Sequence, residues 1–157
     1  MILEILLAAA LAPQITQTSS GARHSATVIM SDKAGLRRLQ ERLGWADAIV
    51  SGDTVYVSGV VAGLRPGETD MEPGLVRAFD ELGGILKRAG VTWNDVVEMR
   101  TYHTNPVAQI EKFAEVKMRF IKAPYPAWTA VGTTALLALR GFAEISLVAK
   151  VPKKGQP

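Results

Sequence analysis

The C-terminal segment has the clearest alternation of apolar and polar positions. From Phe142 to Val151, one alternate set is wholly apolar: Ala143, Ile145, Leu147 and Ala149. The other set is mixed: Phe142, Glu144, Ser146 and Val148. This period of two predicts a strand with one face in the core. Its second face carries a mid-strand carboxylate, which is costly to bury unless it is paired or used.

A strand is also predicted just before this one, over Trp128–Ala135, with a loop at Leu139–Gly141 between the two. Pro126 precedes it and suits a strand start or an edge. Further apolar runs predict four more strands. They are Ala26–Met30, then Ala46–Val50 and Thr54–Val60 around the turn Ser51-Gly52-Asp53, and then Val96–Thr104.

A helical period marks the segment Glu72–Ala89. Its apolar positions are Leu75, Val76, Phe79, Leu82, Ile85, Leu86 and Ala89. Pro73 suits the first turn and Gly90 the end. We expect Gly83 and Gly84 to let this helix lie close to the sheet. A shorter helix is predicted up to Leu43, capped by Ser31 or Asp32 and ended by Gly44.

The second long helix, Val107–Lys122, has one unusual position. Its apolar stripe consists of Val107, Ile110, Phe113, Ala114 and Ile121. At about 100° per residue, Lys117 falls near the middle of that stripe. Three interpretations are open: the side chain extends past the helix end into water, the stripe is rotated slightly, or the ammonium reaches a pocket at the sheet edge.

These elements predict an α+β single domain, with a mixed five- to six-stranded sheet and two long helices on one face. The opposite face carries mixed residues, among them Tyr56, Ser58, Glu144 and Ser146. Other copies of the chain are expected to cover it. Gly59, inside a strand-like run, indicates either a bulge or close approach by a ligand or another backbone.

Composition narrows the function classes. The chain has 157 residues, 48% of them hydrophobic, which suits one domain with a core. It has no cysteine, which excludes disulfides and thiolate chemistry. His24 and His103 have no ligand spacing around them, so no metal site is expected. The net charge of +3 is scattered, so no nucleic-acid partner is expected.

The N-terminus leaves two interpretations open. Met1–Ala12 is apolar but too short to span a bilayer. Residues 1–24 are therefore a signal peptide or a disordered N-terminal extension, and residues 25–157 form the domain. A signal would place the protein in the periplasm or outside the cell, and an extension would leave it in the cytoplasm. No membrane partner is expected.

Two short motifs near the C-terminus resemble the signature of the YjgF/Rid family of imine and enamine deaminases: Pro126-Ala127-Trp128-Thr129 and Ala143-Glu144-Ile145. Trp45–Gly59 is similar to the family's first hairpin, and Gly90–Val97 to the turn before a later strand. The family signature has an arginine where this chain has Trp128. The resemblance implies a chorismate mutase-like fold and a homotrimer that binds small molecules in clefts between subunits.

The resemblance also implies site residues. Glu144 would be catalytic and hold a water. The expected substrate-binding residues are Trp128, Trp45, Ser58, Gly59, Lys117, Thr129 and Ala130. The family arginine binds a substrate carboxylate with two hydrogen bonds, which tryptophan cannot reproduce. Lys117 could replace its charge, and Trp128 and Trp45 could sandwich the substrate.

Two functions remain open on these grounds. One is a deaminase-type hydrolase of small reactive imines with an altered substrate range. The other is a trimeric protein that binds or scavenges small molecules without deaminating them. Neither needs a cofactor. RNA cleavage, attributed to some relatives, is disfavoured because the sequence has no basic stripe and no catalytic arrangement of histidines.

Overall fold

The computed structural model describes residues 21–153 of the chain. Most of the predicted signal peptide or extension, residues 1–24, lies outside these residues. In chain order the elements are β1 Thr27–Ile29, α1 Ala34–Leu43, β2 Ala48–Ser51, β3 Thr54–Gly63, α2 Glu72–Arg88, the 3₁₀ turn η1 Trp93–Asp95, β4 Val96–His103, α3 Pro106–Phe120, β5 Ala127–Gly132 and β6 Gly141–Lys150.

The six strands form one mixed sheet in the order β1-β2-β3-β6-β4-β5. Strand β6 lies in the middle and is antiparallel to both β3 and β4, while β4 and β5 are parallel. The last two strands of the chain are therefore not neighbours. β4 lies between them, and β5 forms one edge of the sheet.

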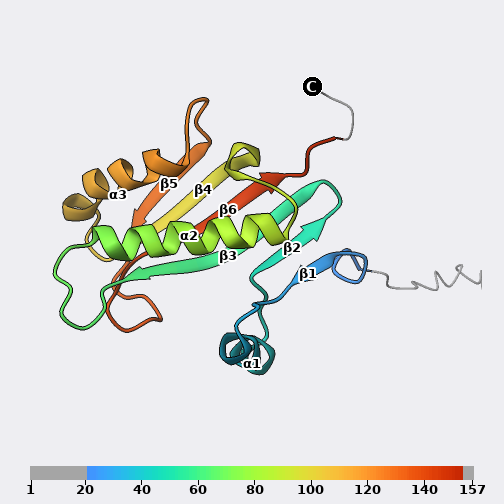
Figure 1. The fold of residues 1–157 in the computed structure, drawn as a ribbon, viewed down its shortest axis with the longest axis horizontal. Helices are drawn as coiled ribbons and strands as arrows, with labels where there is room; N and C mark the ends of the chain where they lie inside the picture. The colour runs from blue at the N-terminus through green and yellow to red at the C-terminus, as the bar shows by residue number, and fades with distance from the viewer. Residues whose placement is uncertain (1–20, 154–157) are drawn as a thin grey trace, which may run out of the picture.

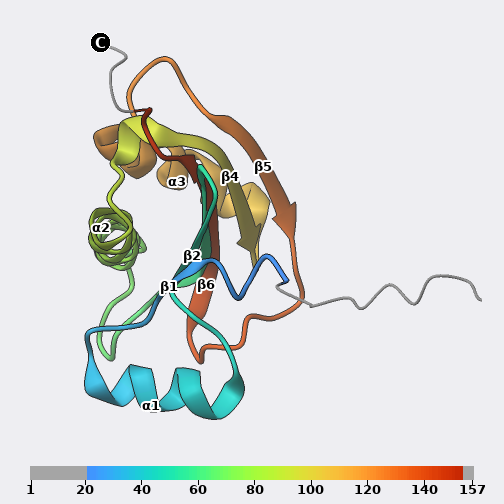
Figure 2. The same ribbon diagram turned by 90° about the vertical axis from the view of Figure 1, so that its right-hand side faces the viewer.

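Helices α2 and α3 pack against each other on one face of the sheet (Figure 1). Figure 2 shows α1 apart from both, beyond one end of the strands. The core lies between the sheet and the two long helices, with Phe79, Phe113 and Ile145 among its fully buried side chains. The predicted α+β domain, with a mixed sheet and two long helices on one face, is confirmed. No helix of the described residues is long and apolar enough to cross a membrane.

The alternation predicted for β6 is correct except at Phe142. Ala143, Ile145, Leu147 and Ala149 are buried beneath the helices, while Glu144 and Ser146 are only half-buried. Phe142 was expected on the mixed face, but it is buried, with its ring near Gly74 of α2. The predicted loop at Leu139–Gly141 is longer, because β5 ends at Gly132.

The predicted cap of α1 is wrong. The N-cap residue is Lys33, whose side chain makes no capping bond. The Ser31 hydroxyl accepts from the Lys33 backbone N–H at 3.2 Å, and so shapes the turn before the helix. The end at Gly44 is as predicted, with a left-handed φ of 79°.

The close approach of α2 to the sheet occurs at Gly74, not at Gly83 and Gly84. A Cβ on Gly74 would lie 2.7 Å from the carbonyl oxygen of Gly63 in β3. At Gly83 the nearest atom is in the Trp93 side chain, 3.3 Å away, and at Gly84 it is 3.9 Å away. The sequence pattern could not show this, because the contact depends on how the helix crosses the strand.

The apolar stripe of α3 is rotated from the predicted one. Val107 is 89% exposed, whereas Gln109, Phe113 and Val116 are buried. The Asn105 side chain accepts from the Ala108 backbone N–H and begins the helix, and Pro106 is its first residue. The rotation leaves Lys117 partly buried at the side of α3 that faces β5.

Candidate functional site

Glu144 lies on the sheet face that no helix of the described residues covers. In the register of the sheet it pairs with Tyr102 of β4 and Val61 of β3. It lines a hollow of about 430 Å³ together with Gly59, Tyr102, Ser146 and the loop after β5, which contributes Thr133 and Ala135–Leu137. Within the described chain, its carboxylate has no hydrogen-bond or ion-pair partner. A half-buried carboxylate with free lone pairs can hold a water or accept a proton.

Gly59 lies directly beneath this carboxylate. A Cβ built on Gly59 would be 1.9 Å from Oε1 of Glu144 and 2.8 Å from its Cδ. The β3–β6 register shifts between Val57 and Val60, so Gly59 also sits at a bulge. The bulge and the close approach predicted as alternatives for Gly59 are both present. The approaching group is the Glu144 side chain of the same chain, not a ligand or another backbone.

Ser58 and Trp45 lie together near the start of β2, in a hollow of about 260 Å³ lined also by Ala46, Ile49 and Tyr56. The Ser58 hydroxyl donates to the Ala46 carbonyl at 2.7 Å. Ser58 thus ties the bulge of β3 to the segment that carries Trp45. Trp45 is 36% exposed and does not line the Glu144 hollow in one protomer.

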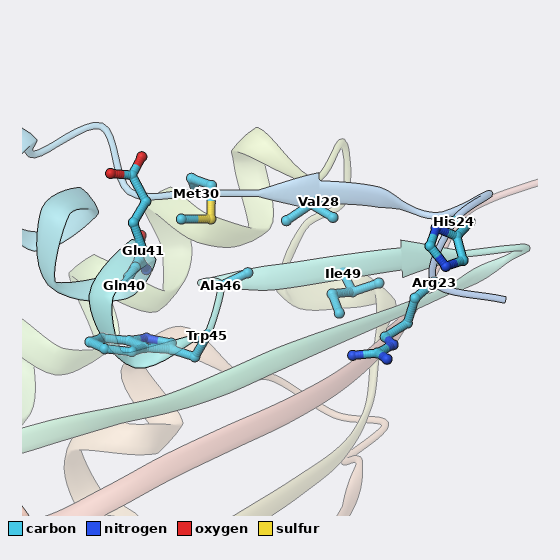
Figure 3. A pocket seen from close by; sticks show the side chains of 10 residues that line it. Arg23, His24, Val28, Met30, Gln40, Glu41, Trp45, Ala46 and Ile49 are labelled. Carbon is cyan, nitrogen blue, oxygen red and sulfur yellow. The ribbon is translucent and has the colours of Figure 1, made fainter. Parts of the chain in front are cut away.

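A wider hollow of about 540 Å³ lies on the other side of Trp45, between β1, α1 and β2 (Figure 3). Most of its labelled side chains are apolar, among them Val28, Met30 and Ile49. The amide group of Gln40 is hydrogen-bonded within the chain: its Oε1 accepts from the Ser31 N–H, and its Nε2 donates to Asp47. The carboxylate of this hollow belongs to Glu41, an exposed residue of α1, so the hollow does not bring Glu144 to Trp45.

Trp128 points to the helix face of the sheet, away from Glu144. It pairs with the buried Met99, and its ring stacks on Phe113 of α3 with centroids 5.6 Å apart. Its indole N–H donates to Thr101 Oγ1 at 3.0 Å. The Lys117 ammonium lies over the same ring, 3.7 Å from its centroid. The slight rotation of the α3 stripe, one of the open interpretations of Lys117, is observed, and it leaves the ammonium on this ring beside the edge strand β5.

Thr101 continues the contact inward to His103. The Nε2 atom of His103 is 2.9 Å from Thr101 Oγ1, and its Nδ1 has no partner within the described chain. Burial lowers the pKa of His103, against a smaller opposing effect of the Gln109 side chain. Burial also lowers the pKa of Lys117.

The remaining two candidates are split between the faces of β5. Thr129 pairs with Arg100 on the uncovered face, and Ala130 pairs with the buried Thr101 on the helix face. Apart from Ser58 and Trp45, the candidates of one protomer therefore form two groups. Glu144, Gly59 and Thr129 are on the uncovered side, while Lys117, Trp128 and Ala130 are on the helix side at the β5 edge. The expected sandwich of Trp45 and Trp128 is not formed within one chain.

Tyr102 is a further candidate that the sequence analysis missed. It pairs with Glu144 across β4 and β6 and is 40% exposed in the same hollow. The period of two in β4 could have placed it on the uncovered face, but it could not show which strand lies beside β6. Among the described residues, no cluster of three ligating side chains could hold a metal ion.

Comparison with known proteins identifies the family. The family model described as endoribonuclease L-PSP matches residues 36–151. The chain is 38% identical over 125 residues to the RutC family protein YjgH of Escherichia coli K12, covering 77% of this chain and 93% of that protein. The solved structure of a protein named YJGH has a TM-score of 0.68 at 35% identity, covering 82% of this chain and 98% of that one.

Two further solved structures agree. Rv2704 of Mycobacterium tuberculosis, from the YjgF/YER057c/UK114 family, has a TM-score of 0.69 at 25% identity, covering 80% of this chain and 99% of that one. RidA of Psychrobacter sp. PAMC 21119 has a TM-score of 0.62 at 28% identity, covering 69% and 89%. By its family match, its identity to YjgH and its fold, this chain belongs to the YjgF/YER057c/UK114 (Rid) family.

Proposed function

We propose that this chain is an imine or enamine deaminase-type hydrolase that acts on small reactive imines in clefts between the subunits of a homotrimer. The observation that carries the proposal is the Glu144 carboxylate, set over Gly59 in a hollow of the uncovered face without a partner in the described residues. A structural carboxylate in that position would be expected to have a hydrogen-bond donor.

The chemistry needs little more than a held water and a proton carrier. Glu144 takes a proton from a water as its oxygen attacks the imine carbon. The imine nitrogen receives that proton, which gives a neutral carbinolamine. Glu144 then transfers the hydroxyl proton of the carbinolamine to its nitrogen, and the C–N bond breaks to release ammonia and leave a carbonyl. One carboxylate can act as base and then as acid. No oxidant or metal takes part in this sequence.

The position of Lys117 and Trp128 supports a site between subunits. Lys117 and Trp128 lie on the helix side of the sheet, so one chain cannot bring them to its own Glu144. Strand β5 is an edge strand, and five of its six residues are exposed. The uncovered face carries large exposed side chains, among them Val28, Tyr56 and Tyr102. A second copy covering this face would complete both groups.

The test is a direct assay with 2-iminopropionate and related imines, generated in situ by an amino-acid oxidase. We expect the protein to accelerate loss of imine and Glu144→Gln to reduce the rate by about 10²-fold or more. Glu98→Gln is the matched control. Glu98 faces the same side but is ion-paired with Arg100 at 2.7 Å. Equal losses in the two variants would contradict the role of Glu144.

The alternative function is a trimeric small-molecule binding or scavenging protein without deaminase activity. It is favoured by Trp128, which occupies the place of the family arginine and uses its N–H within the chain. No acceleration with any imine would support it. A Trp128→Arg variant that gains activity on acidic imines would instead show that only the anchor differs.

RNA cleavage, the activity in the description of the family model, is not favoured by the histidines. His103 is fully buried, and its Nε2 contacts Thr101 inside the domain. A buried imidazole cannot reach a phosphate backbone. His24 is exposed in the turn before β1, far along the chain from Glu144.

A further inference from the structure

Trp128 occupies the position at which the family signature has its carboxylate-binding arginine. Its indole N–H already donates to Thr101, and the Lys117 ammonium lies over its ring. We infer that Lys117, held on the Trp128 ring, binds the anionic group of the ligand in this cleft, with Thr101 and His103 as positioning residues. This inference rests on the proposed function, because it places the ligand in the same cleft as Glu144.

Trp128 itself offers a ligand no polar contact. Its one polar atom, Nε1, donates to Thr101 Oγ1 at 3.0 Å, and Thr101 is only 1% exposed. An indole has no acceptor and no second donor. A carboxylate could take this N–H only if the indole gave up its hydrogen bond to the buried Thr101. The positive group at this end of the cleft is therefore Lys117.

Lys117 differs from its neighbours on α3. Lys112 pairs with Glu115 at 2.6 Å, and Arg119 pairs with Glu72 at 2.7 Å. Lys117 has no carboxylate within ion-pair distance among residues 21–153. Its Nζ contacts the ring of Trp128 instead, at 3.7 Å from the centroid. An aromatic face attracts the ammonium but accepts no directed hydrogen bond as strong as a carboxylate's. The outward N–H groups remain available for an anion.

The ring that carries Lys117 is fixed from the core side. Phe113 stacks on it, and Thr101 receives its N–H. His103 contacts Thr101 at 2.9 Å, and its ring meets Phe113 edge-on at 5.0 Å. These buried contacts set the plane of the indole and, through it, the position of the ammonium. An anchor held before the ligand arrives loses less entropy on binding.

A lysine anchor also predicts the selectivity of the cleft. An ammonium is a compact point charge, whereas the guanidinium fork matches the two oxygens of a carboxylate. The cleft should therefore require a negative charge on the ligand but be less strict about its shape. Small sulfonates should compete with small carboxylates, and neutral analogues should not.

The experiment measures binding by calorimetry, with the full-length protein and two inert probes. Pyruvate carries the charge, and pyruvamide is its neutral counterpart. We expect Lys117→Gln to weaken pyruvate binding at least tenfold and leave pyruvamide unchanged, and Lys117→Arg to retain most of the affinity. Lys112→Gln, on the same helix but ion-paired, is the matched control and should bind both probes like the wild type.

The positioning role is tested by the pH dependence of pyruvate binding. Burial lowers the pKa of Lys117, so wild-type affinity should fall at a lower pH than for an ordinary lysine. Thr101→Val frees the indole and exposes the ammonium, so the midpoint of that fall should move up. Trp128→Phe keeps an aromatic ring but removes the N–H. It should move the midpoint in the same direction, and it replaces Thr101→Val if that variant does not fold.

The outcomes separate this inference from the proposed function. Pyruvate binding that is absent in the wild type, or unchanged in Lys117→Gln, overturns the inference even if imines are hydrolysed through Glu144. Borohydride trapping of pyruvate on Lys117 also overturns it, because the amine would then act as a nucleophile. Lys117-dependent binding without hydrolysis of any imine supports the inference and contradicts the deaminase.

Discussion

The side chain of Glu144 occupies the space that any side chain at position 59 would need. Gly59 has no positive φ, so its backbone tolerates alanine. The obstacle is the Glu144 side chain, whose Oε1, Cδ and Cγ would lie 1.9, 2.8 and 2.9 Å from the new Cβ. Because that carboxylate ends a flexible side chain beside a hollow, it can rotate away at little cost. The absence of a side chain at Gly59 therefore leaves room for the Glu144 carboxylate and contributes little to the stability of the fold.

We therefore predict that Gly59→Ala changes the free energy of unfolding by less than about 1 kcal/mol. Imine hydrolysis should nevertheless fall nearly as far as in Glu144→Ala, because the carboxylate is displaced. Urea denaturation and the imine assay measure the two effects. The double variant Gly59→Ala/Glu144→Ala is the control and should be no less active than Glu144→Ala alone. Full activity in Gly59→Ala would contradict this account.

His103 predicts a pH dependence of stability. Its pKa is lowered in the folded state, so the unfolded chain binds more protons as the pH falls. The stability due to neutral His103 is complete above its unfolded pKa of about 6.5 and is lost below it. Thermal unfolding should show a lower midpoint at pH 5 than at pH 7. His103→Gln should reduce this difference, and His24→Gln, at an exposed position, should leave it intact.

At the scale of elements, the approach of α2 to β3 depends on one glycine. A Cβ at Gly74 would lie 2.7 Å from a backbone carbonyl and 3.0 Å from the ring of Phe142, neither of which can move freely. At Gly84, ten residues along the same helix, the nearest atom is the end of the Arg88 side chain at 3.9 Å. The two glycines have the same helix propensity in different surroundings.

We expect Gly74→Ala to destabilise the fold by about 1–3 kcal/mol, the usual cost of overpacking, despite the better helix propensity of alanine. Gly84→Ala should stabilise it by up to about 1 kcal/mol. Urea denaturation of both variants measures the difference. If both stabilised the protein equally, the close contact of α2 with Gly63 would be wrong.

At the scale of the whole molecule, the sheet has one face under helices and one without. Tyr56 is 53% exposed and Val28 52% exposed on the uncovered face. They lie in one row of the sheet with Ile49 between them, and an apolar row of this kind is expected to be covered by another protein surface. The candidate residues lead to the same expectation of a second copy on this face. Glu144 lies on one side of the sheet and Lys117 on the other, so a site that uses both needs two copies.

The proposed homotrimer should give three times the mass of the chain in light scattering after size-exclusion chromatography. Tyr56→Asp, which puts a charge on the uncovered face, should shift the protein toward monomer and reduce imine hydrolysis with it. Val107→Asp is the control. Val107 is 89% exposed on α3, in the helix layer, so its variant should keep the wild-type mass. A wild-type monomer would contradict the intersubunit cleft.

The sequence by itself determined the elements, the two-faced sheet and the presence of a carboxylate on its mixed face. These follow from local periods, which the chain carries in neighbouring residues. The resemblance of two short C-terminal motifs to the family signature is also local, and so is the presence of Trp128 where that signature has an arginine.

Only the tertiary structure decided what lies beside each of these residues. The order of the strands put Tyr102 next to Glu144, the rotation of α3 put Lys117 on Trp128, and the crossing of α2 over β3 made Gly74 rather than Gly83 the contact. Such neighbours are far apart along the chain. They depend on strand pairing and helix orientation, which one residue of slip or a small rotation would change without altering any local pattern.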